Sequence, residues 1–495
     1  MKSLYMFKNK EYWLIISALF FFSLPCIGKD KKGPAQIEVF PEKKITSINP
    51  NFFGTCPSFF NLSSRRMADG KVARHLKNLP IRVLRFPGGT DSDNYLWDAH
   101  RVHDPNRWPA YQGPESMDTD RFISLCRQIN AEPLMVVNTE IAFFENPKRS
   151  VELAADWVHY CNIEKNYNIK YWEIGNEPYF HTRFNAKEYA RLFIKIAKAM
   201  KAVDPDIKIA AVGNWNIDYP GRKAMISSKN LEKAQRLEVK YENGNWDLYD
   251  KIHELETVEN PPKWWSNVFD IAGPHIDIVS VHWYFNTRYQ LPNMQKKLNR
   301  LKNLTRQKIP SKEIPIIITE WNVHKQGVKK NRRLLALAKA IGKFIDSDVQ
   351  MAFYWPLFGF GNHHPRSLLD HRDNSTLPNY ELLHLFSKNM GTHRIQSTAA
   401  SENAPYHFAS IARKKQISVF LVNSKEKSQK ISLVLQGSPA KNYQLTTLIA
   451  RNTPKLHFDT RKRTMTLKYS RSPLTFELPP LSITLVKIPS PEVDP

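Results

Sequence analysis

The chain has 495 residues, of which 42% are hydrophobic and 12% aromatic, and a formal net charge of +25. This length exceeds what one small core needs, and this composition excludes an intrinsically disordered chain. We therefore expect a large folded domain together with a smaller one.

The first 28 residues have the pattern of a secretory signal. A basic segment with three lysines precedes an apolar run over 13–24, which is too short to cross a membrane comfortably. Small residues follow at Cys26 and Gly28. We expect an exported chain, periplasmic, at the cell surface or extracellular, without a membrane span after cleavage. An uncleaved anchor and a lipidated Cys26 are the alternatives.

Eight short apolar runs, continuous and rich in Val and Ile, predict strands that are buried on both faces. Apolar residues at helical spacing lie between them, over 120–129, 151–160, 189–202 and 334–345. Regular alternation of strand and helix predicts an α/β fold, a (β/α)8 TIM barrel. The eight predicted strands cover 52–55, 83–86, 133–138, 170–174, 207–212, 276–281, 314–319 and 351–355. The long polar segment 218–270 is expected to carry loops or short helices beside the site.

The pattern changes beyond residue 390, where short alternating runs are separated by turn residues. Such runs predict an antiparallel β-sandwich. A strand-like run over 35–40 precedes the barrel and is expected to join that sandwich. We therefore divide the chain into a signal peptide at 1–28, an N-terminal strand segment at 29–48, the barrel at 49–390 and the β-sandwich at 391–495.

Two glutamates stand at the ends of predicted barrel strands. Glu177 follows the fourth strand in Asn176-Glu177-Pro178, and Glu320 ends the seventh in Thr319-Glu320-Trp321-Asn322. Functional residues of such barrels lie at the carboxyl ends of the strands, and a pair of carboxylates there can cleave a glycosidic bond. A single glutamate at a strand end is more often part of a salt bridge, so it is the pair that favours catalysis.

These motifs are similar to those of the clan A glycoside hydrolases, (β/α)8 enzymes with catalytic glutamates after strands four and seven. Within that clan, Arg85-Phe86-Pro87-Gly88-Gly89 and Glu320-Trp321-Asn322-Val323 most resemble family 51, the α-L-arabinofuranosidases. Families 39 and 79, the xylosidase/iduronidase and glucuronidase/heparanase groups, are near alternatives. The resemblance implies a retaining hydrolase that cleaves a plant, algal or host polysaccharide or oligosaccharide.

The resemblance also implies roles. Glu177 would be the acid/base, with its pKa raised by burial and neighbouring negative charge, and Glu320 the nucleophile. A buried arginine would hold the nucleophile ionised, a tyrosine would orient it, an asparagine would bind the sugar 2-hydroxyl and a tryptophan would form the sugar platform. The substrate-binding candidates are Arg85, Asn138, Asn176, His282, Tyr284 and Trp355. Glu140 is a further candidate beside Asn138.

We expect no metal and no cofactor. The histidines at 363 and 364 and the acids Asp91 and Asp93 could line the site, but their spacing does not suggest metal ligands. The expected partner is an oligosaccharide or polysaccharide, acidic if the charge of +25 has a role, and not nucleic acid. An ordinary basic surface is the alternative explanation of that charge. A non-catalytic carbohydrate- or polyanion-binding protein is the alternative function, and the intact glutamate pair argues against it.

Overall fold

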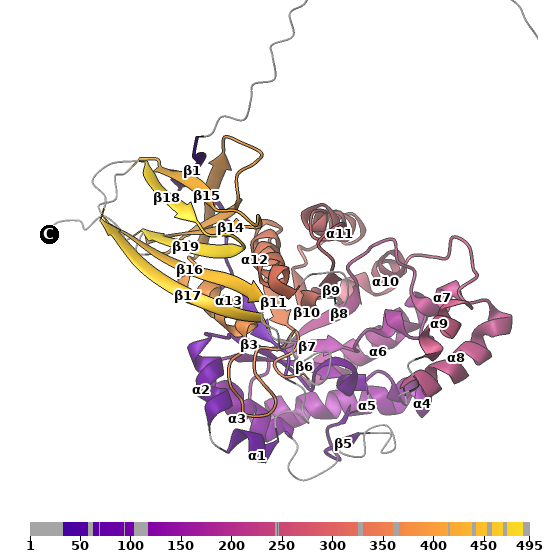
Figure 1. Ribbon diagram of the computed structural model, residues 1–495. Helices are drawn as coiled ribbons and strands as arrows, with labels where there is room; N and C mark the ends of the chain where they lie inside the picture. The colour runs from indigo at the N-terminus through magenta and orange to yellow at the C-terminus, as the bar shows by residue number, and fades with distance from the viewer. Residues whose placement is uncertain are drawn as a thin grey trace, which may run out of the picture.

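The computed structural model describes residues 33–57, 63–68, 70–93, 95–102, 117–242, 245, 247–324, 330–359, 366–413, 416–437, 442–452, 458–468 and 473–488. The predicted signal at 1–28, with Cys26, and the histidines at 363 and 364 lie outside these residues. Within them, no helix combines the length and apolar character needed to cross a membrane. Figure 1 shows a barrel surrounded by helices, with a curled sheet beside it.

Eight parallel strands close the barrel, in chain order around the ring. They are β2 (Phe53–Thr55), β3 (Val83–Phe86), β6 (Glu132–Val137), β7 (Tyr171–Ile174), β8 (Lys208–Asn214), β9 (Ile278–Phe285), β10 (Ile316–Val323) and β11 (Met351–Tyr354). All eight coincide with predicted runs, because strands buried on both faces leave an uninterrupted apolar signal. The predicted TIM barrel is confirmed.

Helices follow the barrel strands and form the outer layer (Figure 1). They are α1 (Ser64–Met67), α2 (Lys71–Asn78), α3 (Thr119–Ile129), α4 (Ile141–Phe144), α5 (Pro147–Val158), α6 (Ala186–Val203), α7 (Arg222–Met225), α8 (Ser228–Glu242), α9 (Leu248–His253), α10 (Trp264–Ala272), α11 (Met294–Lys308), α12 (Lys330–Asp346) and α13 (Pro378–Asn389). A capping box between Asn185 and Glu188 starts α6, which begins three residues before the predicted helix. The segment between the fifth and sixth barrel strands, predicted to carry loops or short helices, holds α7 to α10, of which α8 is longer than predicted at 15 residues. The short strands β4 (Tyr95–Leu96) and β5 (Arg101–Val102) pair with each other beside the barrel.

Nine strands form the second sheet, in the order β17-β16-β19-β14-β13-β12-β1-β15-β18. Their bounds are β1 (Ala35–Ser47), β12 (His393–Ala399), β13 (Tyr406–Ile411), β14 (Ile417–Asn423), β15 (Gln429–Leu435), β16 (Asn442–Asn452), β17 (Phe458–Lys468), β18 (Leu474–Leu478) and β19 (Ser482–Ile488). All pairs are antiparallel except β1 with β15. The sheet encloses a core of its own between its inward-facing residues.

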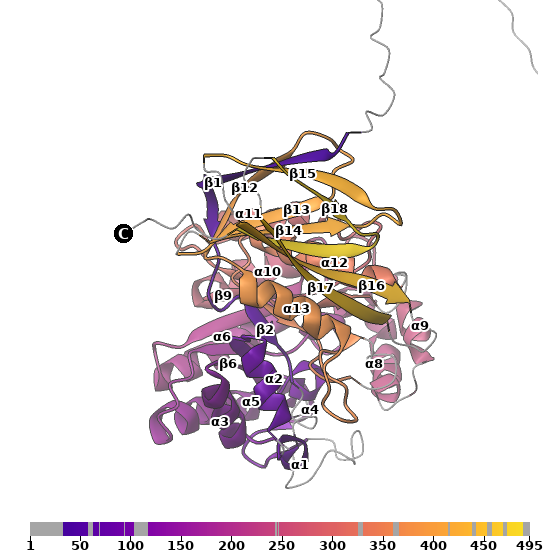
Figure 2. The ribbon, with the colours of Figure 1, turned by 60° about the vertical axis from the view of Figure 1, so that its left-hand side comes forward.

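The other face of the sheet packs on the barrel through α12 and α13, which lie between the two (Figure 2). Phe386 of α13 stacks on Phe420 of β14 with ring centroids 4.2 Å apart. Phe420 and its neighbours Val422 and Leu448 belong to the same continuous apolar cluster as the barrel core. Barrel and sheet therefore share one core.

Candidate functional site

The structure brings Glu177 and Glu320 to one place at the carboxyl ends of β7, β9 and β10. His282 of β9 contacts both, with its Nδ1 2.9 Å from Glu177 Oε1 and 3.7 Å from Glu320 Oε2. These two carboxylate oxygens are therefore at most about 6.6 Å apart, the two distances taken end to end. Retaining glycosidases hold their carboxyl groups about 5–5.5 Å apart and inverting enzymes about 6.5–9.5 Å. The upper limit of about 6.6 Å includes the retaining range and excludes most of the inverting range.

Arg85, at the end of β3, fixes one side of the site and is fully buried. Its Nη1 donates to Glu320 Oε1 at 2.8 Å, its Nη2 to Asn176 Oδ1 at 2.9 Å and its Nε to Glu173 Oε2 at 2.7 Å. A buried guanidinium needs such partners, and in return it stabilises the charge on Glu320.

Glu320 is held on its second oxygen as well. The Tyr284 hydroxyl donates to Oε2 at 2.6 Å, and only 6% of the Glu320 side chain is exposed. Burial and the charge of Glu320 hold the pKa of Tyr284 well above its usual value, so the phenol remains a donor. Both oxygens of Glu320 therefore have a fixed donor, which is the arrangement a carboxylate needs to stay ionised and oriented.

Glu177 has a different environment, with 26% of its side chain exposed. Its backbone is left-handed (φ 46°), a conformation that costs a non-glycine residue about 1–2 kcal/mol and is typical of functional sites. Oε1 accepts from the Tyr179 hydroxyl at 3.1 Å and contacts His282. Burial raises the pKa of Glu177, but the hydrogen bond and charge of His282 outweigh burial and lower it. The direction differs from the raised pKa that we predicted.

His282 accounts for that difference. Burial lowers the pKa of this imidazole, but the charges of Glu320 and Glu177 outweigh burial and raise it. The lowered pKa of Glu177 and the raised pKa of His282 favour a proton on the imidazole and a charge on the carboxylate. Sequence reasoning could not anticipate the exchange, because the two residues are 105 positions apart and meet only in the closed barrel.

Asn176 and Asn138 were predicted as binding residues, and the structure gives them different surroundings. Asn176 lies within the site, where its Oδ1 accepts from Arg85 and its Nδ2 donates to Asp93 at 3.1 Å. Asn138 caps the start of α4: its Oδ1 accepts from the backbone N–H groups of Glu140 and Ile141 at 2.8 and 3.3 Å. Among the described residues, no contact joins Asn138 to either glutamate.

Trp355 follows β11 and lies against the Gly88-Gly89 turn at the end of β3. A Cβ built on Gly89 would lie 2.5 Å from Trp355 Cη2, and Gly89 has a φ of +53°. The glycine therefore serves the close approach of the backbone to the indole ring. The predicted platform, Trp355, follows β11, which is four strands from β7 around the ring, and it lies against the turn that follows β3.

Sequence reasoning missed three residues of the site. Glu173 anchors Arg85 and also accepts from Thr319 Oγ1 at 2.8 Å; a charged residue inside an apolar strand was its signal. Tyr179 donates to Glu177. Arg366 lies with its guanidinium 5.3 Å from the ring centroid of Tyr284, only 4% exposed, and its Nε and Nη2 have no hydrogen-bond partner among the described residues. Nothing in the sequence singled it out.

Comparison with known proteins assigns the relationship. A family model described as "Alpha-L-arabinofuranosidase 1 domain" matches residues 75–254. A probable α-L-arabinofuranosidase C of Aspergillus clavatus is 27% identical over 300 residues, which are 53% of this chain and 52% of that protein. An intracellular exo-α-(1→5)-L-arabinofuranosidase of Acetivibrio thermocellus is 24% identical over 342 residues, 58% of each chain. The chain is therefore similar in sequence to α-L-arabinofuranosidases.

This relationship confirms the resemblance drawn from the motifs. The crystal structure of the α-L-arabinofuranosidase of Thermotoga maritima superposes with a TM-score of 0.69 at 20% identity, over 92% of this chain and 100% of that one. That likeness extends the shared fold to the second sheet. The chain spans about half the length of the curated arabinofuranosidases that it matches. The matched segment 75–254 contains Glu177 but ends before Glu320, whose assignment rests on the geometry.

Proposed function

We propose that the chain is a retaining glycoside hydrolase that acts on α-L-arabinofuranosides, with Glu320 as nucleophile and Glu177 as acid/base. The observation that carries the proposal is the contact of one imidazole, His282, with both carboxylates. It limits the distance between two of their oxygens to about 6.6 Å, which supports a double displacement. The names of the relatives support the sugar, and the donors on Glu320 support its role as the ionised partner.

In the first step, Glu320 Oε2 or Oε1 forms a bond to the anomeric carbon as the bond to the leaving oxygen breaks. The leaving oxygen takes a proton from Glu177. Because the proton rests on His282 before the substrate binds, it passes along the hydrogen bond of 2.9 Å to Glu177 as negative charge develops on the leaving oxygen.

In the second step, water replaces Glu320 at the anomeric carbon. Glu177, now ionised, takes a proton from that water, and the carboxylate of Glu320 is released with its donors Arg85 and Tyr284 in place. The exposed fraction of 26% at Glu177, against 6% at Glu320, suits the residue that meets both leaving group and water. Two inversions give a product with the original anomeric configuration.

Two substitutions test the assignment. We expect Glu320→Ala to abolish turnover of every glycoside. Glu177→Ala should slow aryl glycosides with good leaving groups least, and azide should partly restore its rate by replacing the water that no longer has a base. Glu164→Ala, on an exposed surface, is the matched control. NMR of the first-formed product checks the stereochemistry. Wild-type rates in both site variants, or an initially inverted product, would contradict the proposal.

A second candidate is a xylosidase, iduronidase or glucuronidase/heparanase-like hydrolase acting on an acidic glycan, and Arg366 favours it. Two nitrogens of this buried guanidinium, beside Tyr284, have no hydrogen-bond partner within the described part of the chain, and they would gain a charge-assisted pair from a substrate carboxylate or sulfate. We expect Arg366→Gln to raise KM for nitrophenyl glucuronide and to leave that for nitrophenyl arabinofuranoside nearly unchanged. If the wild-type protein and the Arg366→Gln variant both hydrolyse the arabinofuranoside and neither hydrolyses the glucuronide, this candidate is rejected.

We also propose that residues 1–28 direct export. The basic start and the short apolar run support this location, and the word intracellular in the name of the Acetivibrio relative describes that protein. Expression in the native host with cell fractionation, followed by N-terminal sequencing of the product, tests it. Full-length protein confined to the cytoplasm would reject the proposal.

A further inference from the structure

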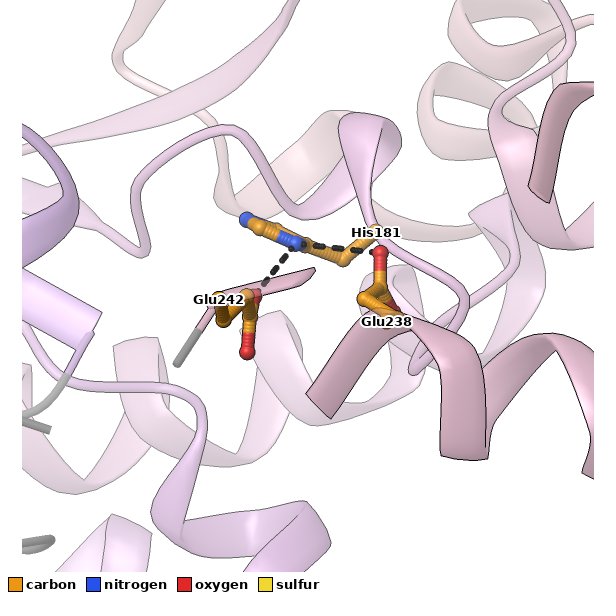
Figure 3. A group of neighbouring side chains, drawn as sticks. All are labelled: His181, Glu238 and Glu242. Carbon is orange, nitrogen blue, oxygen red and sulfur yellow. Dashed lines mark ion pairs between the residues drawn. The ribbon is translucent and has the colours of Figure 1, made fainter. Parts of the chain in front are cut away.

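His181, Glu238 and Glu242 form a buried group of charged side chains that has no part in the proposed reaction. His181 lies four residues beyond Glu177 in the chain. His181 follows the turn that carries Tyr179, and Glu238 and Glu242 lie one turn apart on α8. Their side chains are 12%, 3% and 7% exposed. Figure 3 shows the Nδ1 edge of His181 directed between the two carboxylates, with Nε2 directed away from them.

The three ligand atoms converge. His181 Nδ1 is 3.4 Å from Glu238 Oε1 and 3.2 Å from Glu242 Oε1, and all three atoms lie within 4.8 Å of one another. Zinc bonds to nitrogen and oxygen of about 2.0–2.1 Å place tetrahedral ligand atoms about 3.3 Å apart. Two of the three edges therefore already have the length that an ion would impose.

The neighbours of His181 hold the outer oxygens of both carboxylates. Glu238 Oε2 accepts from the backbone N–H of Thr182 at 2.9 Å and from its hydroxyl, and Glu242 Oε2 accepts from Arg183 Nη2. Glu238 Oε1 remains without a hydrogen-bond donor in the described part of the chain, although it is buried and faces His181. Arg222 Nη1 is 4.0 Å from this oxygen, beyond hydrogen-bond distance. Outer contacts of this kind orient metal ligands.

The surroundings of the group are rich in carboxylates. Ion pairs join four of them, Glu140, Glu238, Glu242 and Glu256, to the guanidinium groups of Arg183 and Arg222. A divalent cation would add positive charge beside Glu238 and Glu242.

We propose that His181 Nδ1, Glu238 Oε1 and Glu242 Oε1 bind one divalent transition-metal ion, Zn²⁺ or Mn²⁺. One imidazole and two carboxylates suit these borderline and hard ions better than Cu⁺ or Ca²⁺. The ion would tie α8 to the segment that carries Glu177, and its role is structural. The proposal is independent of glycosidase activity. Its competitor is a proton: burial opposes the charge, but the two glutamates raise the pKa of His181 to about 10 in the metal-free chain.

The direct test is elemental analysis of the full chain, made without a histidine tag and purified without chelator at pH 8. We expect about one Zn²⁺ or Mn²⁺ per chain. After dialysis against EDTA, adding ZnCl₂ or MnCl₂ should raise Tm in proportion to the logarithm of the metal concentration above Kd. A metal-free wild-type protein whose Tm responds to neither ion would overturn the proposal, with the proton as the occupant.

Variants separate this site from adventitious binding. Glu238→Gln removes a ligand charge at constant size and should weaken metal affinity by about tenfold or more. Glu256→Gln is the matched control, because Glu256 pairs with Arg222 and His253 but does not face the converging atoms. It should keep wild-type metal content. Equal losses in both variants, or none in Glu238→Gln, would overturn the assignment. If Glu238→Gln fails to fold, the wild-type metal content and Tm response still decide.

Discussion

The proton held between His282 and Glu177 sets the pH range over which the site can act. His282 has a raised pKa and Glu177 a lowered one, so below the pKa of His282 the pair carries one proton and titrates as a unit. The pair loses its proton, and with it the general acid, as pH rises through the raised pKa of His282. That upper limit lies above the usual histidine value of about 6.5.

We expect His282→Asn to move the alkaline limb of the kcat/KM profile to lower pH. Without the imidazole, the proton must reside on Glu177 alone, and a glutamate titrates near about 4.3, or higher where burial raises its pKa. The limb should therefore fall from above about 6.5 to below it. Profiles on one aryl arabinofuranoside measure this, with His159→Asn on the exposed surface as control. An unmoved limb would contradict a shared proton.

At this scale the sequence predicted where the site residues stand on the barrel strands, but it did not predict which side chains they contact. Glu177 and Glu320 stand at the ends of barrel strands, where parallel strands bring side chains to one edge, so the sequence was sufficient to predict that they lie at the same end of the barrel. The pKa of Glu177 depends on His282, and the anchoring of Arg85 on Glu173 depends on barrel closure. Asn138 stands at a strand end as predicted, but its side-chain oxygen accepts hydrogen bonds from the backbone at the start of α4. Its place at a strand end did not predict this local contact.

At the scale of elements, the close contact of α12 with β13 depends on one glycine. A Cβ built on Gly342 of α12 would lie 2.2 Å from the Tyr406 hydroxyl and 3.2 Å from Phe408 Cδ2. Gly342 is inside the helix, where alanine normally stabilises by about 1 kcal/mol. Here the tyrosine hydroxyl is buried and must move to admit the methyl group.

We expect Gly342→Ala to lower Tm rather than raise it. Tyr406→Phe removes the oxygen that clashes and costs little, because that hydroxyl has no hydrogen-bond partner among the described residues. The double variant should therefore recover most of the loss, which a double-mutant cycle of thermal unfolding measures. Additive effects of the two substitutions would place the strain elsewhere.

The elements themselves were largely predictable, and the group around His181 was not. Eight apolar runs identified eight strands because each strand is buried on both faces. In α8, by contrast, the spacing of Glu238 and Glu242 places two like charges on one helix face, a pattern that usually means solvent. Only the fold shows that this face is buried against His181, so the sequence predicted no metal site.

At the scale of the molecule, barrel and sheet should unfold together. The apolar cluster of the barrel includes Phe420, Leu448 and Leu485 of the sheet, and separating the two would expose α12 and α13 to water. We expect a single calorimetric transition with equal calorimetric and van't Hoff enthalpies. Two resolved transitions would contradict this expectation, because they would show that the barrel and the sheet unfold separately despite the shared core.

The net charge of +25 permits a further test at this scale. If the charge draws in an acidic polymer, kcat/KM on that polymer should fall steeply with salt, since screening shortens to about 8 Å at physiological ionic strength. Rates on a small neutral arabinoside should barely change and serve as the control. Parallel salt profiles on both substrates would leave the charge without a role in substrate choice.

The place of β1 has a consequence for synthesis of the protein. Ile37 pairs with Ala399 on one side and with Leu433 on the other, so β1, which is made before the barrel, occupies the interior of a sheet whose other strands are made after the barrel. Until then its backbone amides and carbonyls are unpaired, and an unpaired strand invites wrong partners. The whole barrel is synthesised before the strands that pair with β1. Pairing across this sequence distance is slow, and the unpaired strand can aggregate in the meantime. We therefore expect a chaperone that binds extended segments to bind β1 during synthesis.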